Sequence, residues 1–314
     1  MNGNQREVII LGAGPAGLSA ALLLGRCRRR VLVVDSGTPR NARSRAVHGF
    51  LTRDGIAPEM LRGIGREELL RYPQVELRDD LATAARALPG GGFEIEFRAA
   101  PPIACRKLLV ATGVMDVLPD IEGFAACHGR SVFHCPYCDG WEVRDQPIAV
   151  YSQDEDACGF ALALSHWSRD LVLCTDGPTG LDGAQRERLE RRWIPVREER
   201  IVRLEHEHGV LRRIVFASGA ELERRALFFH SLPRMQSSIA VDLGAKTTHL
   251  GVVATGKHER TNVPDLFVAG DASRDVQLAI IAAAEGVQAG FEIHAELARE
   301  DLVSSDAIAR AMSR

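Results

Sequence analysis

Residues 8–35 constrain the fold of this chain more than any other segment. A short apolar run typical of a buried strand leads into the glycine-rich turn of residues 12–17, GAGPAG, and then into a helical pattern. A second apolar run follows and ends in Asp35, 23 positions after Gly12, close to the roughly 20 expected for a ribose-binding acid. The arrangement predicts a strand–turn–helix–strand unit that binds a dinucleotide.

The residues of this turn have distinct physical roles. Gly12 permits a tight turn, Gly14 lets a pyrophosphate approach the backbone, and Gly17 allows helix and strand to pack closely. The helix start offers free N–H groups and a positive dipole end to the phosphates. Asp35 can accept hydrogen bonds from a ribose, but the pattern alone does not separate FAD from NAD.

Two later segments are typical of nucleotide-binding strand ends. One apolar strand ends in the ATG of residues 111–113, and another ends in the GD of residues 270–271, before an alanine-rich helical run. An acid between a strand and a helix can bind ribityl or phosphate-linked hydroxyls. N–H groups at such a helix start can face an electron-rich ring.

Residues 134–142, HCPYCDGWE, contain two cysteines separated by two residues. Such a pair can close a redox disulfide, and His134 can stabilise a thiolate at the adjacent Cys135. A zinc site that includes Cys127, His128 and His134 is an alternative, but two adjacent residues are poorly spaced as ligands, so no metal is expected. A glutaredoxin-type domain does not fit, because the pair lies deep in the chain between two nucleotide-binding patterns.

In order and spacing, GAGPAG, the ATG strand end, CPYCDG and AGDASRDVQLAIIAAAEG resemble the low-molecular-weight thioredoxin reductases. The resemblance covers essentially the whole chain. It implies an α/β fold with two Rossmann-like, three-layer ββα dinucleotide-binding domains, the second inserted in the first. Residues 1–116 and 248–314 would form the FAD-binding domain, and residues 117–247 a degenerate NAD(P)-binding-like domain that carries the cysteine pair.

The same resemblance implies roles for individual residues. Cys138 would lie next to the flavin, Cys135 would exchange with substrate, and Asp139 would act as the acid–base residue. His48 lies in the segment that resembles the flavin-contact loop, although a structural histidine is an equal interpretation. The FAD-binding positions would be Gly12, Gly14, Pro15, Ala16, Gly17, Asp35, Asn41, His48, Ala111, Thr112, Gly113, Gly270, Asp271, Gln277 and Leu278.

The second dinucleotide site of that family lacks its chemistry here. The glycines expected in its loop fall on Ser152, Gln153 and Asp154, and without glycine the backbone cannot come close to a pyrophosphate. Residues 154–156 add three acids at the helix start, and Asp176 and Gly177 stand where that family usually has a histidine–arginine cluster for the 2′-phosphate. We expect that no nicotinamide cofactor is used; NADPH binding through a variant loop is the alternative.

These features predict a FAD-dependent dithiol oxidase. A small-molecule dithiol would reduce the Cys135–Cys138 disulfide, and two electrons would pass through FAD to O2, giving H2O2 without NADPH. The chain resembles the branch that closes disulfides in natural products such as gliotoxin, holomycin and especially romidepsin. The alternatives are a thioredoxin reductase, driven by NADPH or ferredoxin, and a flavin-binding protein without turnover.

Composition argues against other classes. The net charge of −3 gives no basic excess for nucleic acid, and no apolar run approaches the ~20 residues of a membrane helix. The apolar run near the N-terminus is too short for a secretory signal, and seven scattered cysteines fit a cytoplasmic protein. The resemblance alone implies a homodimer.

Overall fold

The computed structural model describes residues 5–230 and 233–312, which divide into two compact units. Unit 1 comprises the residues up to Ala42, Phe50–Met115 and the residues from Arg234 onward. Unit 2 comprises Arg43–Gly49 and Asp116–Pro233. The chain thus returns to unit 1 at Arg234, whereas the sequence predicted a return at residue 248. The earlier return follows because the strand at Arg234–Met235 pairs with Val114–Met115.

Unit 1 is built on a sheet that, in the described residues, has seven strands in the order β3-β2-β1-β6-β5-β4, with β17 paired to β6. The strands β1, β2, β3, β6 and β17 run parallel, whereas β5 pairs antiparallel with both β4 and β6. The strand bounds are β1 Gln5–Leu11, β2 Val31–Asp35, β3 Val75–Asp79, β4 Ala82–Ala87, β5 Phe93–Phe97, β6 Ile103–Val110, β7 Val114–Met115, β16 Arg234–Met235 and β17 Leu266–Val268.

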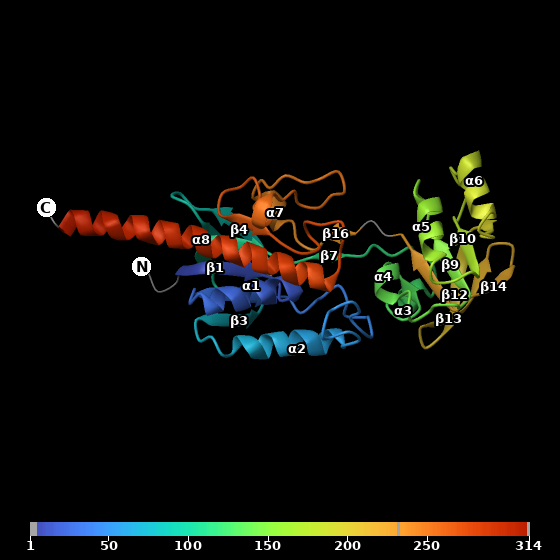
Figure 1. The fold of residues 1–314 in the computed structure, drawn as a ribbon, viewed down its shortest axis with the longest axis horizontal. Coiled ribbons are helices and arrows are strands. Elements are labelled where there is room, and N and C mark those ends of the chain that lie inside the picture. The colour runs from blue at the N-terminus through green and yellow to red at the C-terminus, as the bar shows by residue number, and fades with distance from the viewer. Residues whose placement is uncertain (1–4, 231–232, 313–314) are drawn as a thin grey trace. The chain divides into compact units, whose positions relative to one another are not determined.

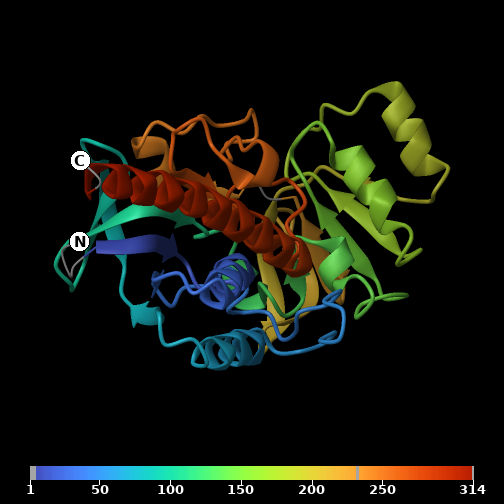
Figure 2. The ribbon, with the colours of Figure 1, turned by 60° about the vertical axis from the view of Figure 1, so that its left-hand side comes forward.

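Alternate side chains of each strand point to opposite faces of this sheet, and side chains on both faces are buried. Ile10 and Val33 cluster with helix residues on one face. Ile9 and Leu32 cluster on the other face, with Phe93 of β5 and with Ile239. Helices α1 and α8 lie side by side on the first face (Figures 1 and 2). The helices are α1 Pro15–Arg26, α2 Pro58–Leu69, α7 Ile239–Asp242, the 3-10 helix η1 Lys257–Glu259 and α8 Ala279–Met312.

Helix α8 packs so closely on α1 that a Cβ atom added at Gly286 would lie 1.9 Å from the carbonyl oxygen of Ala16. This contact holds the start of α1 against the C-terminal helix. Although α8 has 34 residues, neither it nor another helix in the described part of the chain is long and apolar enough to cross a membrane.

Unit 2 has three layers. Its described residues form a parallel sheet in the order β11-β10-β9-β15-β8 and an antiparallel sheet in the order β12-β13-β14. Ala149 of the parallel sheet clusters with Ile214 of the antiparallel one, and Val150 clusters with Ala161 and Leu189 of the helices. The elements are α3 Phe124–Cys127, β8 Val132–Phe133, α4 Pro136–Asp139, β9 Ile148–Tyr151, α5 Ala157–Leu164, β10 Leu171–Cys174, α6 Gly183–Glu190, β11 Val196–Arg197, β12 Ile201–Glu207, β13 Val210–Phe216, β14 Glu221–Glu223 and β15 Ala226–Phe229.

Candidate active site

The turn between β1 and α1 has the geometry of a phosphate-binding loop. Gly12 has a φ of +104°, and a Cβ atom there would lie 2.4 Å from the carbonyl oxygen of Ala111. At Gly17 a Cβ atom would lie 1.9 Å from the carbonyl oxygen of Gly12, whereas at Gly14 it would meet no atom within 4 Å. The backbone at Gly14 therefore faces open space at the start of α1, where a phosphate can approach.

Two polar side chains in unit 1 fit the polar groups of a dinucleotide. The Asp35 carboxylate accepts hydrogen bonds from Arg66 Nη1 at 3.0 Å and from the Gly37 N–H at 3.1 Å, which leaves lone pairs for ribose hydroxyls. Thr112 Oγ1 is shielded from solvent, and no group in the described residues hydrogen-bonds to it. Since a buried hydroxyl is normally bonded, Thr112 is suited to a ligand.

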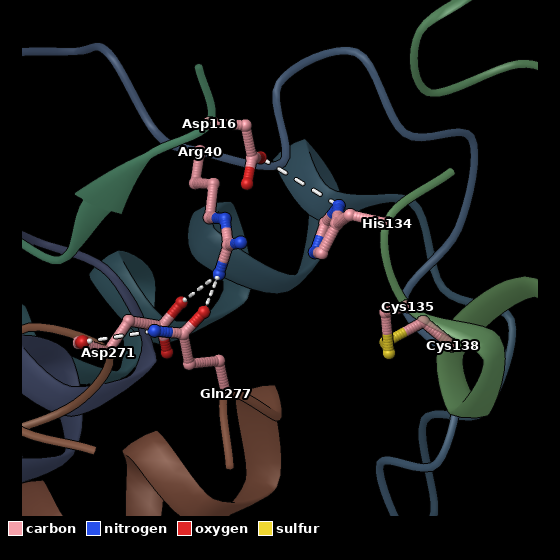
Figure 3. The surroundings of a disulfide bond; sticks show 7 residues. All are labelled: Arg40, Asp116, His134, Cys135, Cys138, Asp271 and Gln277. Carbon is pink, nitrogen blue, oxygen red and sulfur yellow. Dashed lines mark hydrogen bonds and ion pairs between the residues drawn. A yellow bond between two sulfur atoms is a disulfide. The ribbon is translucent and has the colours of Figure 1, made fainter. Parts of the chain in front are cut away.

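The turn before α8 is held by charged side chains. Arg40 Nη1 donates to Asp271 Oδ2 at 3.0 Å and to Gln277 Oε1 at 2.6 Å (Figure 3). The buried Glu285 carboxylate accepts the Gly270 N–H at 2.8 Å. Arg40 lies in a loop and belongs to no motif. Glu285 belongs to the segment AGDASRDVQLAIIAAAEG, but nothing in that segment indicates that its carboxylate turns back to Gly270.

Fourteen of the fifteen predicted FAD-binding residues lie in unit 1. The open backbone at Gly14 and the buried hydroxyl of Thr112 fit FAD. His48 is the exception, since it belongs to unit 2, where its Nε2 lies 3.5 Å from Glu142 Oε1. The fourteen are Gly12, Gly14, Pro15, Ala16, Gly17, Asp35, Asn41, Ala111, Thr112, Gly113, Gly270, Asp271, Gln277 and Leu278.

Cys135 and Cys138 form a disulfide at the start of α4, with their Cα atoms 5.3 Å apart (Figure 3). Pro136 occupies the first turn of this helix, where its fixed φ suits the helix and its missing N–H is not needed. Other cysteines are inert by comparison: burial raises the pKa values of Cys105 and Cys174 to about 12, so both thiols stay protonated at neutral pH.

Asp139 follows the disulfide and has the properties of a proton donor. Burial raises its pKa to about 7; the neighbouring Glu142 carboxylate also raises it, and His48 lowers it. The segment Arg43–Gly49 brings His48 to this place, anchored by a 2.7 Å hydrogen bond from Arg43 Nη1 to the Ala125 carbonyl. A carboxyl group with a pKa near 7 can take and return a proton at physiological pH.

A second cluster lies beside Cys135. Asp116 Oδ2 is 3.8 Å from His134 Nδ1 and 4.0 Å from His128 Nε2. The three side chains place potential metal-ligand atoms within 4.8 Å of one another. The zinc site considered from the sequence included Cys127 in place of Asp116, because Asp116 belongs to no motif. Cys127 is buried, and burial raises its thiol pKa.

In unit 2, the loop after β9 is filled by its own carboxylate. Asp154 Oδ1 accepts hydrogen bonds from Ser152 Oγ at 3.0 Å and from the Asp156 N–H at 3.1 Å, and the other oxygen pairs with His230 Nδ1. Asp154 thus satisfies the polar groups that a phosphate would satisfy in a glycine-rich loop.

The end of β10 is similarly engaged. Asp176 Oδ1 accepts the Ile201 N–H at 2.5 Å, and Asp176 Oδ2 accepts the Tyr151 hydroxyl at 3.4 Å. A carboxylate therefore stands where a 2′-phosphate would need cations, and unlike a basic cluster it repels that phosphate.

Comparisons with known proteins agree with this geometry. The family model described as pyridine nucleotide-disulphide oxidoreductase matches residues 6–286. The crystal structure of HlmI is 34% identical with a TM-score of 0.95, covering 100% of this chain and 99% of HlmI. That of a putative thioredoxin reductase TrxB from Bacillus anthracis is also 34% identical, with a TM-score of 0.90 and coverages of 94% and 99%.

A probable thioredoxin reductase from Arthroderma benhamiae is 28% identical over 330 residues, or 95% of this chain and 81% of the relative. These matches confirm the predicted α/β fold and the predicted resemblance to thioredoxin reductases. Thus the chain belongs to the pyridine nucleotide-disulphide oxidoreductase family, whose thioredoxin-reductase-like members are flavoproteins, and it is a disulfide oxidoreductase.

Proposed function

We propose that this protein is a FAD-dependent dithiol oxidase that closes a disulfide in a small-molecule dithiol, of the kind made in natural-product biosynthesis. The observation that carries the proposal is the Asp154 carboxylate, which fills the loop where NADPH would bind. A disulfide is nevertheless present at Cys135 and Cys138, so the redox pair remains without an evident nicotinamide donor. Electrons then enter through the cysteines.

FAD would be held by the open loop at Gly14, by Asp35 and Thr112, and by the turn at Asp271. When bound, it supplies a two-electron acceptor for the reduced cysteine pair, and O2 is the proposed terminal acceptor, giving H2O2. The protein's own part is to hold the cysteines, move protons and admit the substrate.

The exchange proceeds in two steps on the protein's sulfurs. One substrate thiolate attacks Cys135 Sγ, the Cys135–Cys138 bond breaks, and a mixed disulfide with Cys135 forms while Cys138 leaves as a thiolate. The second substrate thiol then attacks the mixed disulfide, so the substrate is oxidised and the cysteine pair is reduced. Two protons leave the substrate, and Asp139, whose pKa is about 7, can hold one of them.

Aromatic side chains beside the pair suit a small apolar substrate. Tyr137 and Trp141 are 76% and 65% exposed, and Arg144 lies over the Trp141 ring at 4.0 Å. Exposed aromatic rings bind apolar molecules with little loss of side-chain entropy.

We propose that the protein is cytoplasmic and works as a homodimer. Light scattering of the purified protein tests whether it is a dimer.

Anaerobic reduction of the yellow holoenzyme separates the proposal from its alternatives. We expect a small dithiol to bleach the flavin absorbance, NADPH to leave it unchanged, and readmitted air to restore it with formation of H2O2. Rapid bleaching by NADPH would instead establish a thioredoxin reductase, the name that the A. benhamiae relative bears. A flavin bleached by neither reagent would establish a non-catalytic protein.

The cysteine pair is tested by single substitutions. We expect Cys135→Ser and Cys138→Ser to abolish dithiol turnover while FAD stays bound. Cys27→Ser is the matched control, because Cys27 is a free cysteine in unit 1. Turnover retained in both single variants would rule out the disulfide mechanism.

A further inference from the structure

The loop after β2 brings Arg40 to the turn before α8, and the reaction described so far gives this arginine no role. Two contacts within unit 1 hold the loop. Gln236 Nε2 donates to the carbonyl and hydroxyl oxygens of Thr38, each at 2.8 Å, and the Ala42 N–H donates to the Pro39 carbonyl at 3.1 Å. The backbone on both sides of Arg40 is therefore fixed.

The Arg40 guanidinium forms a partly buried ion pair with Asp271. The Arg40 side chain is 13% exposed and that of Asp271 is 21% exposed. The same Nη1 atom also donates to Gln277 Oε1, and the Gln277 amide nitrogen donates to the carbonyl oxygens of Asp271 and Arg274 at 3.4 and 3.2 Å (Figure 3). Arg40 thus ties the Asp271 carboxylate to the segment that leads into α8.

A second group of charges lies beside the same turn. Arg274 donates to Glu285 at 2.6 Å and to the two carboxylate oxygens of Glu259 at 2.9 and 2.7 Å. Both carboxylates are buried, so one arginine faces two acids. Without Arg40, the Asp271 carboxylate would therefore add a further uncompensated negative charge to this turn.

Helix α8 begins directly after these residues. The first N–H groups of a helix have no partner inside it, and they carry the positive end of the helix dipole. The sequence pattern predicts that N–H groups at this helix start face an electron-rich ring. An unpaired Asp271 carboxylate would oppose that positive end, whereas a carboxylate paired with Arg40 does not.

We propose that Arg40 raises the reduction potential of FAD bound at this turn, because it neutralises Asp271 and keeps the field at the start of α8 positive. The inference rests on the proposed dithiol oxidase function. In the step that it favours, the reduced cysteine pair loses two electrons and two protons and closes its disulfide. FAD takes both electrons and one proton, so it gains one negative charge, and the second proton is released to solvent.

The added negative charge is what the field at α8 stabilises. A higher flavin potential moves the equilibrium toward transfer of electrons from thiols to the flavin, and a tenfold change in a two-electron equilibrium corresponds to about 30 mV. This is the direction that an oxidase needs, whereas a reductase sends electrons from the flavin to the disulfide. Arg40 acts through Asp271 and is a positioning residue.

The reduction potential of the holoenzyme, measured by anaerobic equilibration with an indicator dye of known potential, tests the assignment. Arg40→Gln keeps a donor for Asp271 but removes the charge. We expect the equilibrium constant for flavin reduction to fall about 100-fold, or about 60 mV in potential. Arg40→Lys, which keeps the charge and loses the planar geometry, should stay within about threefold of wild type.

Arg66→Gln is the matched control, since Arg66 pairs with Asp35 as Arg40 pairs with Asp271. We expect it to weaken FAD binding, measured as the Kd for titration of the apoprotein, and to leave the potential within about threefold of wild type, because a ribose gains no charge on flavin reduction. The double variant Arg40→Gln/Asp271→Asn removes both charges and should recover most of the potential lost in Arg40→Gln.

If Arg40→Gln binds too little FAD for the measurement, Asp271→Asn alone provides the test, since it leaves Arg40 unpaired and should raise the potential. A weaker FAD affinity or a lower Tm in Arg40→Gln, with an unchanged potential, would overturn the assignment and show a purely structural contact. A double variant as low in potential as Arg40→Gln would show that the effect does not pass through Asp271. If no dithiol reduces the wild-type flavin although Arg40→Gln lowers its potential, the proposed function is rejected and the role of Arg40 stands.

Discussion

In both units the first loop connects a strand to a helix, but only the loop of unit 1 leaves room for a phosphate. In unit 1, residues 12–17 follow β1 and lead into α1, and the backbone at Gly14 faces open space. In unit 2, residues 152–156 follow β9 and lead into α5, and the Asp154 carboxylate satisfies the loop from within. Strand and helix packing preserves the frame, whereas a few loop residues decide whether a dinucleotide fits.

The largest effect is expected at the open loop. Gly14→Asp places a carboxylate where a phosphate would approach, without a clash, because a Cβ atom at Gly14 meets nothing within 4 Å. We expect the Kd for FAD to rise more than 100-fold, or about 3 kcal/mol, with an unchanged circular dichroism spectrum. Gly63→Asp is the control, since its Cβ also meets nothing within 4 Å. Normal FAD binding by Gly14→Asp would remove this loop from the cofactor site.

Unit 2 has kept its chemistry at Asp139 while losing it at the loop. We expect Asp139→Asn to lower dithiol turnover about 10- to 100-fold and to remove the inflection near pH 7 from the pH–rate profile. The profile measured for wild type and variant with the same substrate checks this. An inflection near pH 7 that persists in the variant would belong to another group.

The same substitution has a predictable effect on stability. Because the folded pKa of Asp139 lies above its unfolded value, the unfolded chain loses this proton first as the pH rises, and stability falls between about pH 4 and pH 7. We expect Asp139→Asn to be more stable than wild type by about 2–4 kcal/mol at pH 8 and equal to it at pH 4. Urea unfolding at both pH values measures this difference, which would be absent if Asp139 titrated normally.

A substitution in the loop at residues 152–156 should have a smaller effect. Asp154→Ala removes the acceptor of the Ser152 hydroxyl and of the Asp156 N–H, and we expect a loss of about 1 kcal/mol, since the side chain is 38% exposed. NADPH should still fail to bleach the flavin, because the variant gains neither a glycine turn nor cations near Asp176. If Asp154→Ala alone enabled reduction by NADPH, Asp154 would be a blocking residue in an otherwise complete site.

The smallest expected effects are two opposite shifts of the Asp139 pKa. The Glu142 carboxylate raises the Asp139 pKa and His48 lowers it. Glu142→Gln should therefore shift the inflection near pH 7 downward by a fraction of a pH unit, and His48→Gln should shift it upward. Shifts in the same direction would show that the His48–Glu142 contact does not act on Asp139 through charge.

The elements of the fold follow from local patterns in the sequence. The apolar run at Val8–Leu11 and the helix after Gly14 are found as β1 and α1, because strand and helix periodicity reflect burial against a core. The final alanine-rich run is also helical and extends to Met312 as part of α8. The cysteine pair and the loop at residues 152–156 could also be identified, because each lies within a few consecutive residues.

Residues that meet across long sequence separations could not be found in this way. Arg40 joins Asp271 and Gln277 across more than 200 positions, and no local pattern marks an arginine in a loop as a site residue. The segment of His48 belongs to unit 2 although its sequence neighbours belong to unit 1. Asp116 lies near His128 and His134, although 12 and 18 positions separate them in the sequence.

The sequence by itself determined the strand–turn–helix–strand unit of residues 8–35, the phosphate loop at Gly12–Gly17, the cysteine pair and the missing glycines at Ser152–Asp154. Backbone conformation and local periodicity encode these features within short segments. The tertiary structure decided which side chains surround them. The pKa of Asp139 and the setting of His134 beside Asp116 depend on burial and on charges from distant segments, and both arise only when the chain is packed.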